Sequence, residues 1–284
     1  MSFDDNAELD TSQVSDARGG GGFGIPGGGR TIGGGLVGLL VTVALGLLGY
    51  NGALPGVSGA GSGDGRALAE KCAASNPNRF DETDCRNVAY VNDIQQFWRQ
   101  TLGDRYRPAK TVFFSRAVAT GCGNATSAVG PFYCPPDERV YVDLTFYDEL
   151  ATRFGAPGEF AQAYVLAHEY GHHVQNLAGT EREVRRLQQS DPGRANQYSI
   201  ALELQADCYA GVWTAHAGGG PVATVSPADI REGLRAAAAV GDDAIQGSDV
   251  HSETWTHGSS AQRQQWFSRG HDTGDPRRCD TLGR

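Results

Sequence analysis

Large apolar residues are almost absent from the start of the chain and then run together. Residues 1–30 are acidic and then glycine-rich, so they cannot bury enough surface to fold alone and we expect a disordered tail. Residues 31–52 carry no charge, which predicts one transmembrane helix, because about 20 apolar residues span a bilayer. A cleaved signal peptide and a buried core helix are the alternatives for this run. Residues 53–65 are small and glycine-rich and predict a flexible linker.

Beyond residue 65 the apolar positions take on the spacing of folded elements. In several segments they recur every three or four residues, which predicts helices, and in two shorter segments they predict strands. The expected helices cover 67–76, 88–103, 159–179, 197–220, 226–244 and 259–270. The expected strands lie in 110–118 and, as a hairpin around a Pro-Pro-Asp-Glu turn, in 130–147. We therefore predict an α+β domain over residues 66–284, mostly helical, with a small antiparallel sheet.

The overall charge argues against one class of partner. The formal net charge is −9 at pH 7. A protein that binds nucleic acid needs a basic face to neutralise phosphates. We therefore expect no nucleic-acid partner.

All six cysteines follow the apolar run, and none forms a CxxC pair. A cysteine zinc site is thus a poor fit, whereas an even number with two closely spaced pairs indicates disulfides made in an oxidising compartment. Many connectivities are possible; the spacing favours Cys72–Cys85 and Cys122–Cys134, which leaves Cys208–Cys279. Unpaired cysteines in a cytosolic protein are the alternative. Disulfides would place residues 66–284 outside the cytoplasm and the N-terminus of a single-pass protein inside it.

The expected helix 159–179 carries the strongest chemical signal. His168, Glu169 and His172 form an HExxH motif. Residues four apart differ by about 40° around a helix, so the imidazoles of His168 and His172 can take two corners of a zinc tetrahedron. Glu169 would then lie beside the metal as a general base. His173 points elsewhere, and we do not expect it to be a ligand.

The third ligand has to come from another helix, because the extended HExxHxxGxxH form is absent and Gln175 stands where its glycine would be. Glu203 and Asp207 lie four residues apart in the otherwise apolar helix 197–220. Buried charges are costly unless they are paired or coordinated. Glu203 as third ligand, with Asp207 orienting a ligand histidine, explains both acids. Two exposed carboxylates on a solvated face are the alternative.

Taken together, HExxH followed by ExxAD resembles the gluzincin pattern, in which that glutamate is the third zinc ligand. More closely, the chain resembles the bacterial neutral zinc metallopeptidases of the YpfJ-like family, through the blocks LAHEYGHHVQ, LELQADCYAGVW and THGSSAQRQQWFSRGHDTGDPRRCDTL. The resemblance extends from the glycine-rich segment to the C-terminus. It implies a zincin-like catalytic domain behind a single-pass anchor in the bacterial cell membrane, and it implies no particular substrate.

Carried onto this chain, the resemblance implies that His168, His172 and Glu203 hold one zinc ion and that Glu169 is the base. We therefore expect a membrane-anchored zinc metalloendopeptidase, which hydrolyses peptide bonds of a peptide or protein substrate with a zinc-activated water. A catalytically silent zinc-binding scaffold or assembly protein is the main alternative. A purely structural zinc site normally has four protein ligands, which favours catalysis here. Another metal-dependent hydrolase built from the same parts is a third hypothesis.

Two further roles are expected near this site. His257, just before the last helix, is a candidate for stabilising the transition state, as is a tyrosine such as Tyr209. By analogy with zincin edge strands, residues 140–144 are expected to pair with an extended substrate. Cleavage specificity and oligomeric state are not encoded in these patterns.

Overall fold

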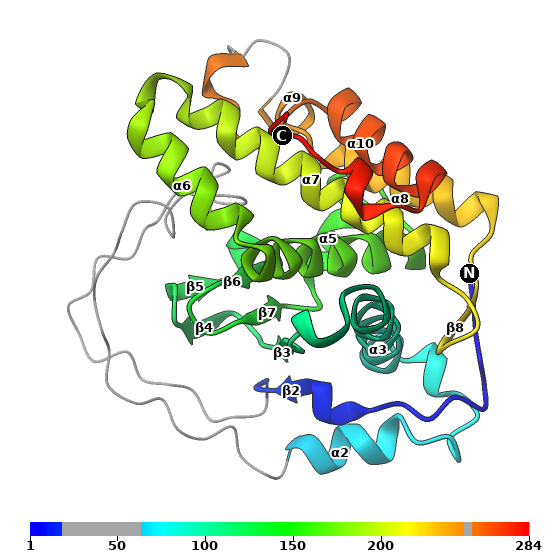
Figure 1. The fold of residues 1–284 in the computed structure, drawn as a ribbon. Coiled ribbons are helices and arrows are strands. Elements are labelled where there is room, and N and C mark those ends of the chain that lie inside the picture. The colour runs from blue at the N-terminus through cyan, green and yellow to red at the C-terminus, as the bar shows by residue number, and fades with distance from the viewer. Residues whose placement is uncertain (19–63, 247–251, 284) are drawn as a thin grey trace, which may run out of the picture.

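The computed structural model describes residues 1–18, 64–246 and 252–283 of the chain. Helices dominate this part, and a small sheet lies along one side of the central helices (Figure 1), so the predicted α+β class is confirmed. The helices are α2 (Asp64–Lys71), α3 (Thr83–Leu102), α4 (Phe146–Thr152), α5 (Glu159–Ala178), α6 (Thr180–Ser190), α7 (Ala195–His216), α8 (Pro227–Ala239), α9 (Asp242–Gln246) and α10 (Ser260–Thr273).

Helices α5 and α7 cross at the centre of the domain, with α5 between α7 and the sheet (Figure 1). The close crossing depends on Gly171 of α5, where an added Cβ would lie 3.0 Å from the Cα of Ala206 in α7. Helix α10 approaches α7 in the same way, because a Cβ on Gly270 would lie 1.9 Å from the carbonyl oxygen of Cys208. These two contacts bring side chains of α5, α7 and α10 into one buried space.

The main sheet has the strand order β2-β3-β7-β6. Its strands are β2 (Val14–Asp16), β3 (Lys110–Phe113), β7 (Arg139–Val142) and β6 (Phe132–Cys134). Strands β6 and β7 form the predicted antiparallel hairpin. However, β2, β3 and β7 run parallel, so the expected antiparallel sheet is wrong for those pairings. The reason is that a separate hairpin, β4 (Ala117–Thr120) with β5 (Gly123–Thr126), and then β6 intervene between β3 and β7 and return the chain to its first direction.

The position of β7 corrects a second expectation. Because β7 lies between β3 and β6, residues 140–144 do not form an edge that could accept a substrate strand. Of the two hairpin strands, β6 lies at an edge of the sheet, and it packs directly against α5. Sequence alone could not choose between the two strands of a hairpin, since both are apolar and adjacent.

The N-terminal residues are folded onto the domain. Besides β2, they form β1 (Ser2–Phe3), which pairs antiparallel with β8 (Val222–Thr224). The predicted disordered tail is therefore wrong for residues 1–18. The segment has too few apolar side chains to form a core of its own. Its backbone, however, forms hydrogen bonds with donors and acceptors of the rest of the domain. Amino-acid composition gives no information about such bonds.

The other expectations for the N-terminal third fall on residues that the structure does not describe. These are the remainder of the tail, the transmembrane helix at 31–52 and most of the linker at 53–65. Among the helices of the described ranges, none combines the length and apolar character needed to cross a membrane.

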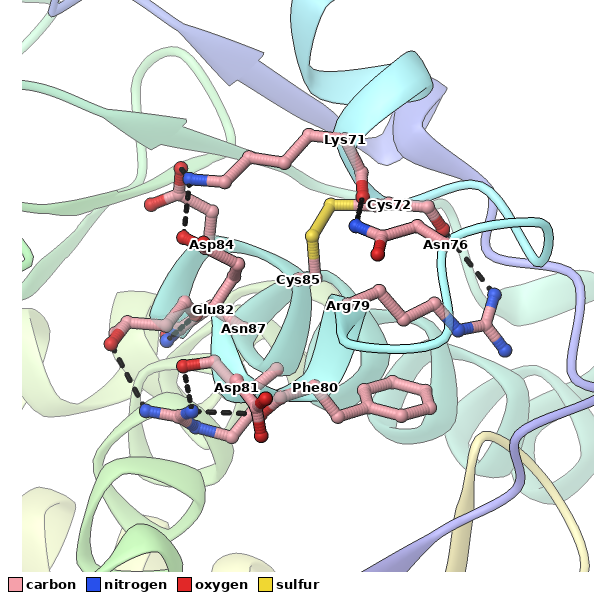
Figure 2. The surroundings of a disulfide bond; sticks show 12 residues. Lys71, Cys72, Asn76, Arg79, Phe80, Asp81, Glu82, Asp84, Cys85 and Asn87 are labelled. Atoms are coloured by element: carbon pink, nitrogen blue, oxygen red, sulfur yellow. Dashed lines mark hydrogen bonds and ion pairs between the residues drawn. A yellow bond between two sulfur atoms is a disulfide. The ribbon is translucent and has the colours of Figure 1, made fainter.

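The three disulfides have the predicted pairing. Cys72–Cys85 joins the end of α2 to the first turn of α3 (Figure 2). Cys122–Cys134 ties the turn of the β4–β5 hairpin to the edge strand β6. Cys208–Cys279 links α7 to the C-terminal segment across 71 residues. A cross-link over so long a loop removes much conformational freedom from the unfolded chain, so we assign it a large share in holding the C-terminal part on α7.

Candidate metal centre

Three buried side chains converge where α5 crosses α7. His168 and His172 lie on one face of α5, and Glu203 faces them from α7. The Nε2 atom of His168 lies 3.2 Å from Oε2 of Glu203 and 3.2 Å from Nε2 of His172. The Nε2 atom of His172 lies 3.5 Å from Oε1 of Glu203. One ligand atom from each residue lies within 4.8 Å of the others, so this group could hold a metal ion.

The spacing of these atoms fits a tetrahedral ion. Ligands about 2.0–2.1 Å from zinc at tetrahedral corners are separated from one another by about 3.3 Å, close to the distances between His168, His172 and Glu203. Two imidazole nitrogens facing each other at 3.2 Å are attractive only with a cation or a proton between them. The donor set of two imidazoles and one carboxylate is one that zinc prefers.

Each histidine is held by a hydrogen bond on its far nitrogen. Nδ1 of His168 lies 2.9 Å from Oδ1 of Asp207, which accepts its proton. Nδ1 of His172 lies 2.8 Å from Oε1 of Gln175. The side-chain nitrogen of Gln175 donates to the carbonyl of Leu202 at 2.7 Å, which fixes the direction of the amide. Both histidines therefore present the Nε2 lone pair to the centre, as metal ligands require.

Asp207 occupies the position predicted for it, but its main partner was not predicted. Arg263 of α10 donates from Nε to Oδ2 at 2.8 Å and from Nη2 to Oδ1 at 3.0 Å. The hydroxyl of Tyr164 donates to Oδ1 at 2.6 Å. Arg263 is only 2% exposed, so a complete ion pair lies in the interior behind His168.

The surroundings also set the charges of the group. Burial opposes the charged form of Glu203, but His172 and His168 hold its pKa below the usual value. Burial lowers the pKa of His172 to about 4, which leaves its imidazole neutral. Burial opposes the charged form of His168 as well, yet Asp207 and Glu203 raise its pKa to about 9. A proton and a cation thus compete for the same lone pair of His168, and metal affinity should fall as the pH is lowered.

Glu169 is buried beside the three ligand candidates, with 8% of its surface exposed. Burial raises the pKa of its carboxyl to about 8, while a hydrogen bond from the backbone of Tyr133 acts in the opposite direction. Tyr133 belongs to β6, so the edge strand runs next to Glu169. A carboxyl with a pKa in this range can accept and return a proton near neutral pH.

His257 is held close to the same centre. Its Nδ1 lies 3.1 Å from Oδ1 of Asp242, and Oδ2 of Asp242 accepts the backbone N–H of His257 at 2.7 Å. His257 is near enough to Glu203 to lower the pKa of that carboxyl. The ring of Tyr209, the other candidate, packs edge-on against Trp98 with centroids 5.3 Å apart.

His173 is not one of the converging ligands, as predicted. Its Nδ1 lies 3.0 Å from the hydroxyl of Tyr133 and its Nε2 lies 2.6 Å from the carbonyl of Arg107. The third histidine of the motif therefore joins α5 to the sheet. It explains why three histidines crowd one helix although only two face the centre.

Replacing Gln175 with leucine should weaken zinc binding by about 10- to 100-fold, the usual effect of removing the partner of a ligand histidine. Without Oε1 of Gln175, the ring of His172 loses its fixed orientation. Competition with a chromophoric chelator measures the affinity, and Gln189→Leu on the exposed face of α6 is the matched control. Unchanged zinc affinity in Gln175→Leu would mean that packing alone holds His172.

An HExxH helix, a glutamate from the next long helix and a buried acid beside the ligands define the zinc metallopeptidase class of site. The chain belongs to the family described as "Putative neutral zinc metallopeptidase", whose sequence profile matches residues 3–282. The predicted resemblance is thus confirmed.

Two relatives illustrate the family. The chain is similar to the uncharacterised protein YpfJ of Escherichia coli K12, with 40% identity over 274 residues, covering 94% of this chain and 91% of that protein. It is also similar to the uncharacterised protein Rv2575 of Mycobacterium tuberculosis H37Rv, with 48% identity over 227 residues, covering 76% and 75%. No solved structure matches the chain.

Proposed function

We propose that this protein is a zinc-dependent endopeptidase with His168, His172 and Glu203 as ligands of one zinc ion and Glu169 as general base. The observation that carries this proposal is the near-tetrahedral spacing of the two imidazole nitrogens and the Glu203 carboxylate. Nε2 of His168 lies 3.2 Å from Nε2 of His172 and 3.2 Å from Oε2 of Glu203, and Nε2 of His172 lies 3.5 Å from Oε1 of Glu203. Within the described residues the group has three protein ligands, and a site of this kind keeps one position for catalysis.

Zinc in this site supplies a Lewis acid that polarises a peptide carbonyl and acidifies water. Glu169 takes the proton from the attacking water and passes it to the leaving amine. Its burial beside the ligand candidates, with 8% of its surface exposed, keeps the carboxyl in place for both transfers. His257, with its Nδ1 held by Asp242, stabilises the negative charge that develops on the carbonyl oxygen.

The substrate is a peptide or protein that binds in an extended conformation beside β6. Support comes from the position of this strand at the edge of the sheet and from the backbone of Tyr133 next to Glu169. An extended peptide added to such an edge gains main-chain hydrogen bonds. The scissile bond would then lie along β6 and over the metal centre.

The domain acts outside the cytoplasm, held at a bacterial membrane through residues 31–52. The three disulfides support the first part, because such bonds persist in oxidising compartments. The uncharged apolar run supports the attachment to the membrane.

The test uses the full-length, oxidised chain and a mixed peptide library. We expect cleavage in the presence of one equivalent of zinc, loss of cleavage after chelation, and recovery when zinc is restored. His172→Ala should neither bind zinc tightly nor cleave. A wild-type protein that binds one zinc ion and cleaves nothing in the library would favour the silent scaffold, and a protein that binds no zinc would refute the site.

A further inference from the structure

The first eighteen residues are folded onto the domain and supply β2, one strand of its main sheet. Strand β2 pairs in parallel with β3, with Val14 opposite Thr111 and Asp16 opposite Phe113. The backbone N–H of Ala17 continues the ladder with a bond of 2.8 Å to the carbonyl of Phe113. The side chain of Val14 is 6% exposed and belongs to the main core. A strand in this position is held by backbone bonds and by packing together.

Buried polar groups of the domain depend on this segment. Arg79 is 1% exposed, and its Nη2 donates to the carbonyls of Asp4, Asp5 and Ala7 at 3.2, 3.0 and 2.8 Å. Figure 2 shows its guanidinium reaching away from α3 beside the Cys72–Cys85 disulfide. Undocking residues 1–18 would break all three of these bonds, so the guanidinium of Arg79 stabilises the docked segment.

A second buried side chain recognises the segment through its backbone. Asn92 of α3 accepts from the N–H of Asp10 at 2.8 Å and donates to its carbonyl at 3.0 Å. The side-chain nitrogen of Gln95, one turn further on, donates to Oε1 of Gln13 at 2.7 Å. Helix α3 is thus built to receive an extended chain at this position.

Residues on both sides of the segment 19–63 bind one carboxylate. Arg18 donates to Asp84 at 2.9 and 3.1 Å. Lys71 of α2, the first helix after the segment, donates to the same Asp84 at 2.9 Å (Figure 2). The chain therefore leaves the folded domain and returns to it on one face.

We propose that residues 1–18 and the catalytic domain lie on the same side of the membrane, as one folded unit. This rests on the proposed membrane attachment through residues 31–52, with that segment entering and leaving the membrane on one face instead of crossing it once. A bilayer cannot pass through a strand ladder, so a chain that leaves at Arg18 and returns at Asp64 ends on the side from which it started. The arrangement predicted from sequence, a single crossing with a cytoplasmic N-terminus and an external domain, is incompatible with the parallel pairing of β2. An external peptidase domain carries its N-terminal residues outside with it.

Thiol labelling in intact cells tests this topology independently of peptidase activity. All six native cysteines form disulfides, so an introduced cysteine is the one that reacts. Full-length Glu8→Cys and Gln189→Cys place a thiol at exposed positions of the N-terminal segment and of α6. Spheroplasts are treated with a membrane-impermeant maleimide before and after detergent. We expect the same labelling pattern for both variants, and opposite patterns would overturn the proposal.

A third variant reports the docking itself. Val14→Cys places the thiol in the core, so it should label far more slowly than Glu8→Cys in detergent and equally fast after denaturation. Labelling of Val14→Cys at the rate of Glu8→Cys in the native protein would show that the segment is not docked, and the proposal would fail. Because neither readout requires catalysis, an inactive protein would leave this result intact.

Discussion

Replacing Glu169 with glutamine should abolish peptide hydrolysis while zinc stays bound. The variant keeps the volume of the side chain and its place in α5, and it removes the group that accepts a proton. General acid–base catalysis contributes about 10²- to 10⁴-fold, so kcat/KM should fall by at least that range. Zinc affinity should change little, because Glu169 is not among the three ligand candidates.

The measurement compares kcat/KM and zinc content of the two proteins, with Glu70→Gln, the same chemical change on the exposed surface of α2, as control. The folding stability of the variant shows whether activity is lost because the base is missing or because the protein unfolds. In the metal-free protein the pKa of Glu169 is raised above its unfolded value to about 8, so its folded state favours the neutral form. Its contribution to stability is present at low pH and is lost as the pH rises from about 4.5 towards 8. Glu169→Gln should therefore be as stable as the wild type or more so at pH 8, and substantial residual cleavage would exclude Glu169 as the base.

Local spacing predicted the parts of the site that lie within single helices. The pair His168 and His172 follows from a four-residue repeat, and so does the pair Glu203 and Asp207, because helix geometry converts such a repeat into one shared face. That both pairs meet followed from chemistry, since two acids in an apolar helix need partners. The structure places the pairs together where Gly171 lets α7 approach α5.

The contacts of α10 and of the N-terminal segment with the rest of the domain were not predicted from the sequence. Nothing in the spacing around Arg263 shows that α10 will lie against α7 and place this guanidinium on Asp207, 56 residues away. Gln175 did carry a usable signal, because it lies three residues after His172 on the same face of the helix.

The N-terminal strand shows the limit of composition arguments. Residues 1–18 have few large apolar side chains, which predicted disorder. Their order comes from Arg79, Asn92 and the edge of β3, which supply hydrogen bonds to the backbone of the segment. Because the segment is bound mainly through its backbone, the amino-acid types within it give little indication of the docking.

Replacing Arg263 with methionine should have the second large effect, on both folding and zinc binding. Methionine fills much of the space but leaves the buried carboxylate of Asp207 without its guanidinium partner. Breaking a buried ion pair in this way costs about 3–5 kcal/mol of folding free energy. The carboxylate of Asp207 is then no longer fixed by two hydrogen bonds from one guanidinium, and it orients the imidazole of His168 less firmly. Zinc affinity should therefore fall by about 10- to 100-fold.

A double variant separates the loss of folding free energy from the loss of zinc affinity. Asp207→Leu combined with Arg263→Met removes both charges, so it should regain much of the folding free energy that Arg263→Met loses. It should not regain zinc affinity, because the acceptor for Nδ1 of His168 is gone. Denaturant unfolding of the metal-free proteins and chelator competition measure the two quantities separately. If Arg263→Met binds zinc as tightly as the wild type, then Asp207 orients His168 without help from α10, and the ion pair serves the fold alone.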